Sequence, residues 1–191
     1  MLTRHEILNF YIDCAVDVFN GDKETCMKRY YAELYDCEFP CDENTEMTEI
    51  QWKNLVNVCA NIVAHQNQFD MRWYHNADGG SCGTTHCIAG WAVVLEDGDV
   101  NMTTTSFSYE QLSQIAEKYG YDEEDMIDSS ACIASAALSP LIEPFFYLIS
   151  GFHPSFTVMD KFILPVLEIA RNESQEMAQL IDSILRPVAQ V

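Results

Sequence analysis

The chain has 191 residues, of which 48% are hydrophobic, and this composition is sufficient for one domain with its own core. It carries 30 acidic and 10 basic residues, so its formal net charge is −20. A negative field of this strength repels phosphate groups, which argues against direct binding of DNA or RNA and favours a protein partner with a basic surface. The same charge is also typical of a protein that is simply kept soluble.

The segment best suited to crossing a membrane, residues 131–150, contains a glutamate and two prolines, so we expect buried helices there and no membrane span. The chain opens without the basic, apolar and small-residue pattern of a secretory leader, which predicts a cytoplasmic protein. Its eight cysteines are then expected to be reduced thiols. Cys14, Cys59 and Cys132 lie on apolar helical stripes and are expected in the core.

Helix starts are recognisable from a Ser or Thr that is followed three residues later by an acid or amide. Thr3 with Glu6 and Thr48 with Gln51 have this spacing, and both precede apolar residues at a period of 3.6. Ile50 is placed on the apolar face of the helix that follows Thr48. The elements expected in this part of the chain are helices over residues 7–18, 23–35 and 50–63, with a loop over residues 37–46.

The same signals continue after residue 107. Ser108 with Gln111 predicts the start of a short helix, and Gly120 stands where a left-handed C-terminal cap is preferred. Tyr109 is placed on the apolar face of this helix. Asp122 then opens another helix, with acids in its first turn that suit the helix dipole.

Two apolar stripes near the end of the chain predict a packed pair of helices. Thr157 with Asp160 marks the start of the first, which we expect Pro165 to kink. Asn172 with Gln175 marks the start of the second more weakly. The stripes cover residues 158–170 and 177–185.

Together these elements predict a mainly all-α fold, in which residues 1–191 form a single compact helical domain of about seven to nine helices. Residues 93–95 and 100–106 also have strand character. We therefore allow for one small β-hairpin around residues 96–99.

Reactive residue types are concentrated in residues 69–92, which read FDMRWYHNADGGSCGTTHCIAGWA. The glycines precede a helix that Thr84 or Thr85 is expected to cap. Cys82 would lie just ahead of the helix N-terminus, where free amides favour a thiolate, and His86 is close enough in sequence to act as its base. Cys82 and His86 are thus the candidate catalytic pair, although no third group that would orient the base is evident.

The same stretch contains zinc-ligand residue types, so a zinc site is a second alternative. Its candidate ligands are His75, Cys82 and His86, but their spacing matches no common zinc framework. A redox disulfide between Cys82 and Cys87 is a third alternative. With no complete ligand set, we expect no other cofactor.

The interpretation that we favour is architectural, with the motif serving as a joint between helices. In this interpretation Asp70 and neighbouring aromatic residues cover the glycine loop, Gly83 permits a turn, and Gly90 permits a close approach of helices. Cys87 is then expected to be a core residue. The residues assigned to this structural motif are Asp70, Trp73, Gly83, Thr84, Cys87, Gly90 and Trp91.

The pattern FDM-x-x-W followed by CGT-x-x-CIAGWA resembles a motif of small uncharacterised proteins of bacteriophages and bacteria. The resemblance covers roughly residues 69–130, and YGYDEE at residues 119–124 is similar to a segment that follows the motif in those proteins. It implies a phage or bacterial cytoplasm, which is the host cytoplasm if the protein is viral. It implies no activity.

Our leading functional hypothesis is a small acidic accessory protein that binds and modulates a host or viral protein. One version has the acids imitate nucleic acid and occupy a nucleic-acid-binding protein. The alternative is a cysteine- or zinc-dependent enzyme centred on Cys82 and His86. We favour binding over catalysis because the catalytic set is incomplete. The sequence does not specify the partner or the oligomeric state.

Overall fold

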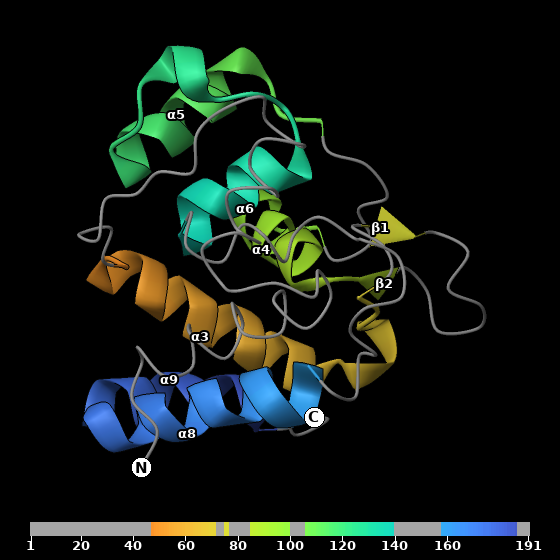
Figure 1. Cartoon of the computed structure of the whole chain (residues 1–191), viewed down its shortest axis with the longest axis vertical. Helices are drawn as coiled ribbons and strands as arrows, with labels where there is room; N and C mark the ends of the chain where they lie inside the picture. Colours follow the sequence, from red (N-terminus) through yellow and green to blue (C-terminus); the bar gives the residue numbers. More distant parts are fainter. Residues whose placement is uncertain (1–46, 72–74, 77–84, 100–105, 140–157, 187–191) are drawn as a thin grey trace, which may run out of the picture.

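The computed structural model describes residues 47–71, 75–76, 85–99, 106–139 and 158–186. These residues form a mainly all-α fold, as expected, with six α-helices and one pair of two-residue strands (Figure 1). The helices expected over residues 7–18 and 23–35 lie outside the described residues, as does the loop over residues 37–46. The α-helices are α3 (Glu49–Ala64), α4 (Ile88–Asp97), α5 (Tyr109–Tyr119), α6 (Ser130–Leu138), α8 (Leu164–Glu173) and α9 (Gln175–Leu185).

Helix α3 lies in the middle of the described structure, with α4 and α6 on one side and α8 and α9 on the other (Figure 1). It begins at the predicted capping box, in which the Thr48 side chain accepts a hydrogen bond from the backbone of Gln51. Its buried residues form a broad face, because it is packed from two sides, and the remaining face is exposed. The prediction that Ile50 belongs to the buried face is wrong, since its side chain is 43% exposed.

Helices α8 and α9 pack against each other and against α3, which confirms the predicted pair. A π-helical turn, η5 (Met159–Ile163), runs directly into α8. Pro165 has no N–H and its ring crowds the carbonyl one turn earlier, so the wider turn accommodates it. The weak cap predicted at Asn172 is wrong, because α8 continues through Glu173 and the Ser174 side chain caps α9.

Helix α4 packs against α3 and α6, and all three contribute to the main core. The β-hairpin allowed for around residues 96–99 is wrong at its first arm, because α4 continues through Asp97. Gly98 ends the helix in the left-handed conformation, with φ 86°, which glycine adopts without a steric penalty. The second arm of that hairpin, up to residue 105, lies outside the described residues.

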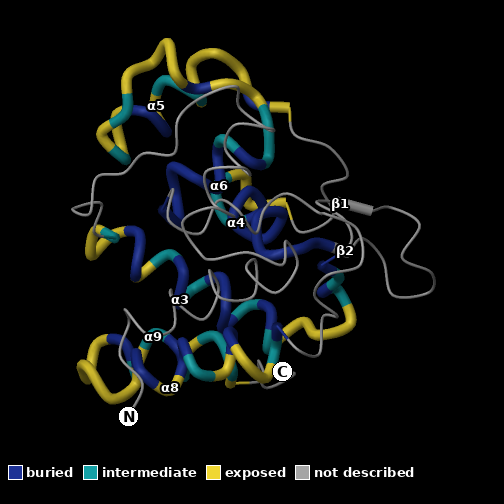
Figure 2. Tube along the Cα trace, in the orientation of Figure 1, coloured by how far each residue is buried: buried dark blue, intermediate teal, exposed yellow. Residues whose placement is uncertain are grey.

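Helix α5 packs on α6 at the edge of the structure (Figure 1). Its buried residue Ile115 belongs to a second apolar cluster, which also includes Phe107 and Met126. Its capping box at Ser108 and its C-terminal cap at Gly120 confirm the predictions. The helix expected to open at Asp122 is a single 3-10 turn, η3 (Glu123–Asp125). Figure 2 shows that much of α5 and of the chain after it is exposed.

No helix among the described residues is long and apolar enough to cross a membrane. In the segment that was the strongest candidate, α6 accounts for residues 130–138 and is largely buried. The expectation of a single domain over residues 1–191 concerns the whole chain and stays a prediction.

Candidate functional site

The two halves of the motif meet next to helix α4. The backbone N–H of Asp70 donates to the carbonyl of His86 at 3.0 Å, and Phe69 forms an isolated parallel bridge with the same residue. His86 also belongs to strand β2 (Thr85–His86), which pairs antiparallel with β1 (His75–Asn76). The FDM segment and the start of α4 are therefore connected through the backbone of His86.

Helix α4 begins at Ile88, two residues after His86. The predicted cap at Thr84 or Thr85 is wrong: the N-cap is Cys87, whose Sγ accepts a hydrogen bond from the Gly90 N–H at 3.5 Å. Thr85 lies in β2 and Thr84 is outside the described residues. The extended strand continues to His86, so the helix cannot start earlier.

Cys87 is fully buried, as predicted, and is a free thiol. Burial raises its pKa to about 11, and the backbone hydrogen bonds at the start of α4 lower it by less. Cys59 is also buried and free, and burial raises its pKa as well. Both thiols are protonated at neutral pH and have the character of core residues. Cys132, expected in the core, is only partly buried.

The rings of His65, Trp91 and His86 form an aromatic cluster where α3 ends and α4 begins. The His65 ring is stacked on Trp91 with centroids 5.7 Å apart, and the buried His86 ring meets Trp91 edge-on at 5.5 Å. Among the described residues, nothing accepts a hydrogen bond from the buried Trp91 Nε1. This geometry supports the interpretation of the motif as a joint between helices.

The remaining residues predicted for catalysis or zinc binding cannot be assembled into a site. Cys82, together with Trp73, Gly83 and Thr84, lies outside the described residues, and of His75 only the backbone pairing is described. Within the described ranges no group of three or more possible metal ligands is found. The catalytic pair of Cys82 and His86 and the zinc site therefore stay predictions.

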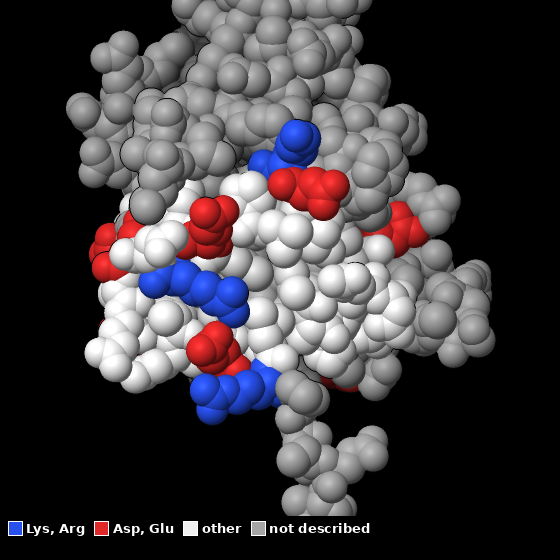
Figure 3. Space-filling model, turned by 90° about the horizontal axis from the view of Figure 1, so that it is seen from below, with Lys and Arg blue, Asp and Glu red and all other residues white. Residues whose placement is uncertain are grey.

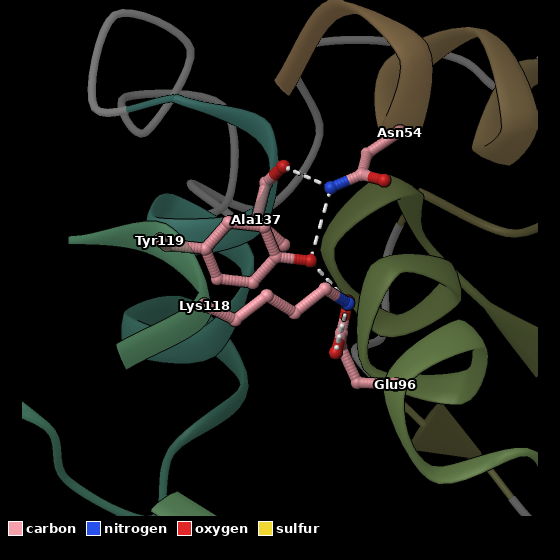
Figure 4. Close-up of polar contacts among 5 residues, drawn as sticks. All are labelled: Asn54, Glu96, Lys118, Tyr119 and Ala137. Carbon is pink, nitrogen blue, oxygen red and sulfur yellow. Dashed lines mark hydrogen bonds and ion pairs between the residues drawn. The ribbon is translucent and has the colours of Figure 1, made fainter. Parts of the chain in front are cut away.

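A polar network that was not predicted joins four helices (Figure 4). The Glu96 carboxylate on α4, only 11% exposed, accepts two hydrogen bonds of 2.9 Å from Lys118 Nζ and one from the Tyr119 hydroxyl. The Asn54 side chain on α3 donates to the Tyr119 hydroxyl at 3.0 Å and to the carbonyl of Ala137 on α6 at 2.9 Å. Burial and the bond to Glu96 raise the pKa of Tyr119 to about 12.

No local pattern predicts this network, because its hydrogen-bonded partners are 22 to 83 residues apart in sequence. The sequence did contain a signal for the position of Glu96 on a helix. Gly98 follows a helical run just as Gly120 does, and reading Gly98 as a C-terminal cap would have placed Glu96 in the last turn of α4.

The chain between residues 108 and 128, which we call the acidic segment, holds the densest group of exposed carboxylates in the described structure. Lys118 is its one basic residue, and Lys118 is already paired with Glu96 outside the segment. Among the described residues no cation forms an ion pair with the acids of this segment. These exposed acids are Glu110, Glu117, Asp122, Glu123, Glu124, Asp125 and Asp128.

The face formed by α8 and α9 has a different charge pattern. Figure 3 shows positive and negative side chains next to one another on the lower face of the molecule. Lys53 pairs with Glu176 at 2.7 Å, and Arg171 pairs with Asp182 at 3.1 Å. Within the described residues, the uncompensated negative charge is therefore concentrated at the opposite end, on α5 and η3.

Tyr109 also differs from its prediction. It was expected on the buried face of α5, but its side chain is 75% exposed and its hydroxyl donates to Glu123 at 3.2 Å. That hydrogen bond and the negative charge of Glu123 raise the pKa of Tyr109. Tyr109 is the first residue of α5, and periodicity alone does not show whether a neighbouring element covers a side chain at a helix end.

No family model, curated protein or solved structure matches this chain.

Proposed function

We propose that this protein is an acidic accessory protein that binds a protein partner with a basic surface, and that the acidic segment makes the contact. The observation that carries the proposal is the segregation of charge. The carboxylates of the acidic segment are exposed and unpaired with cations among the described residues, whereas Glu176 and Asp182 on α9 form ion pairs with Lys53 and Arg171. Unpaired charges are the ones whose field reaches a partner.

Such a surface accelerates association with a basic protein, and dissolved salt screens the attraction. It also disfavours a nucleic-acid ligand, because phosphates and carboxylates repel each other. A protein that normally holds nucleic acid offers the complementary surface, so we include this partner class in the proposal. The phage or bacterial setting rests on the sequence resemblance, and the modulation of a host or viral protein is part of the same proposal.

The test is recovery of partners from a lysate of the cells in which the protein occurs, using matched charge variants as bait. Glu124→Gln with Asp125→Asn removes two charges from the acidic segment, and Asp160→Asn with Glu168→Gln removes two from exposed positions on η5 and α8. Binding is compared at about 0.05 M and about 0.5 M NaCl, between which the screening length falls about threefold. Recovered proteins are identified by mass spectrometry.

We expect the wild type to recover basic proteins at low salt and to lose most of them at high salt. The acidic-segment variant should recover several-fold less, and the α8 variant should match the wild type. If added DNA displaces the same proteins, the partner belongs to the nucleic-acid-binding class. Recovery that the two variants reduce equally, or that salt leaves unchanged, would show that the acidic segment is not the contact.

A further inference from the structure

Two large apolar side chains are exposed within the acidic segment. Tyr109 is 75% exposed and Ile127 is 60% exposed, compared with 43% for Ile50 and 44% for Leu164 elsewhere. Tyrosine is enriched at the energetic centres of protein interfaces, because its large ring is buried at a low entropic cost. Two such side chains within one group of exposed carboxylates combine apolar surface with charge, as protein contact surfaces do.

Hydrogen bonds hold the two segments that carry these side chains together. The Tyr109 hydroxyl and the Ser113 hydroxyl both donate to the Glu123 carboxylate, at 3.2 and 2.7 Å, which fixes η3 against the start of α5. The backbone N–H of Phe107 donates to Asp128 at 3.3 Å, which joins the chain before α5 to the residue after Ile127. Tyr109 and Ile127 are therefore carried by two segments that hydrogen bonds hold together.

The charge around these side chains selects the kind of partner. Glu110 flanks Tyr109, Asp128 flanks Ile127, and Glu123, Glu124 and Asp125 lie between them in sequence. A second copy of this chain would bring a charge of −20 against the same sign, and an anionic membrane would be repelled for the same reason. Only a cationic occupant gains from both the acids and the apolar side chains.

We infer that Tyr109 and Ile127 are the apolar anchors for a lysine- or arginine-rich amphipathic segment of the partner protein. This inference rests on the proposed function and adds to it a specific chemistry. The acids attract the basic side chains of the segment, and Tyr109 and Ile127 bury its apolar ones. A purely basic segment would gain only the first of these contributions.

The probes are two synthetic helical peptides of equal length and equal positive charge. One has leucine at every third or fourth position among the lysines so that one face of the helix is apolar, and the other has serine in place of each leucine. We expect the lysine and leucine peptide to bind about tenfold more tightly, which is the ratio expected from burying part of two apolar side chains. Affinities are measured by titration calorimetry with the full chain.

The variants are Tyr109→Ser and Ile127→Ser, with Ile50→Ser as the control that removes an exposed apolar side chain outside the segment. Tyr109→Ser and Ile127→Ser should each lose most of the preference for the lysine and leucine peptide and keep the affinity for the lysine and serine peptide. Ile50→Ser should keep the preference. Circular dichroism and thermal unfolding check that all three variants fold.

The outcomes separate this inference from the function on which it rests. Equal, salt-sensitive affinity for the two peptides would overturn the anchors and leave an acidic binding surface standing. Binding of neither peptide would overturn both. Loss of the preference in Ile50→Ser to the same degree as in Ile127→Ser would contradict the location of the anchors.

Discussion

At the scale of single residues, the Tyr119 hydroxyl is the point where α3, α4 and α5 are joined. It accepts from Asn54 and donates to Glu96, so its loss removes one partner from each of two side chains. Glu96 keeps Lys118, and Asn54 keeps the carbonyl of Ala137. The hydroxyl therefore contributes stability beyond that of a surface hydrogen bond.

Tyr119→Phe should lower the free energy of unfolding by about 1 to 2 kcal/mol, which is typical of a partly buried hydrogen bond to a charged group. Urea unfolding followed by circular dichroism measures the change. Tyr109→Phe is the matched control, because it removes an exposed hydroxyl that also bonds to a carboxylate. A cost for Tyr119→Phe no greater than for Tyr109→Phe would contradict the role of the network.

The raised pKa of Tyr119 predicts a loss of stability at alkaline pH. The folded chain holds this proton up to a pKa of about 12, whereas the unfolded chain releases it near the ordinary value of 10. The contribution is complete below the lower value, and it is lost as pH rises through the upper one. The stability difference between the wild type and Tyr119→Phe should shrink across this range. A difference that stays constant would show that Tyr119 has an ordinary pKa.

At the scale of elements, the start of α3 depends on the capping box of Thr48 and Gln51. The Thr48 hydroxyl accepts from the Gln51 N–H at 3.3 Å, and the Gln51 side-chain oxygen accepts from the Thr48 N–H at 3.0 Å. The buried Gln51 side chain also donates to the carbonyl of Ala136 on α6 at 3.1 Å. The box thus fixes both the first turn of α3 and its contact with α6.

Thr48→Ala should lower the free energy of unfolding by about 1 kcal/mol, because it leaves the Gln51 N–H without its acceptor. Thr48→Ser keeps the hydroxyl and should cost less than about half as much. Thermal unfolding of the two variants measures the difference. Equal effects of alanine and serine would mean that the Thr48 methyl group, and not the cap, contributes the stability.

The elements that sequence predicted best are those whose signals are local. The capping boxes at Thr48 and Ser108 and the cap at Gly120 depend only on nearby residues, and all three were predicted. The exposure of Ile50 and Tyr109 depends on which neighbour covers each helix end, so periodicity alone placed both incorrectly.

At the candidate sites too, features with local sequence signals were predicted and features that depend on distant contacts were not. Burial of Cys87 followed from its apolar neighbours in sequence, and the structure confirms it. The cap was assigned to Thr84 or Thr85 because hydroxyls are the commoner caps, although a thiol occupies the position. The long-range contacts of Glu96 and Tyr119 have no sequence signal, since they arise only when α4 and α5 are brought together.

At the scale of the whole molecule, negative charge opposes compaction. A net charge of −20 repels itself in the folded state, most strongly where the acids are unpaired. The described carboxylates of α5 and η3 have no paired cation among the described residues, whereas Glu176 and Asp182 form ion pairs with Lys53 and Arg171. Screening should therefore stabilise the protein, chiefly by reducing repulsion within the acidic segment.

We expect the unfolding midpoint in urea to rise as salt increases. At low salt, Glu124→Gln with Asp125→Asn should stabilise the chain by about 0.5 kcal/mol, and Asp160→Asn with Glu168→Gln should stabilise it less. Urea unfolding with NaCl as the screening salt measures both effects. The opposite order of the two double variants would contradict the concentration of repulsion on α5 and η3.

We propose that residues 108–128 form the surface that binds a basic partner. The most direct test is to titrate the isotope-labelled chain with the lysine and serine peptide at low salt and to follow its backbone amide shifts by NMR. We expect shift changes concentrated in α5, η3 and the residues up to Asp128, and we expect these changes to be lost in Glu124→Gln with Asp125→Asn. Changes centred on α8 and α9, or spread evenly over the described helices, would contradict it.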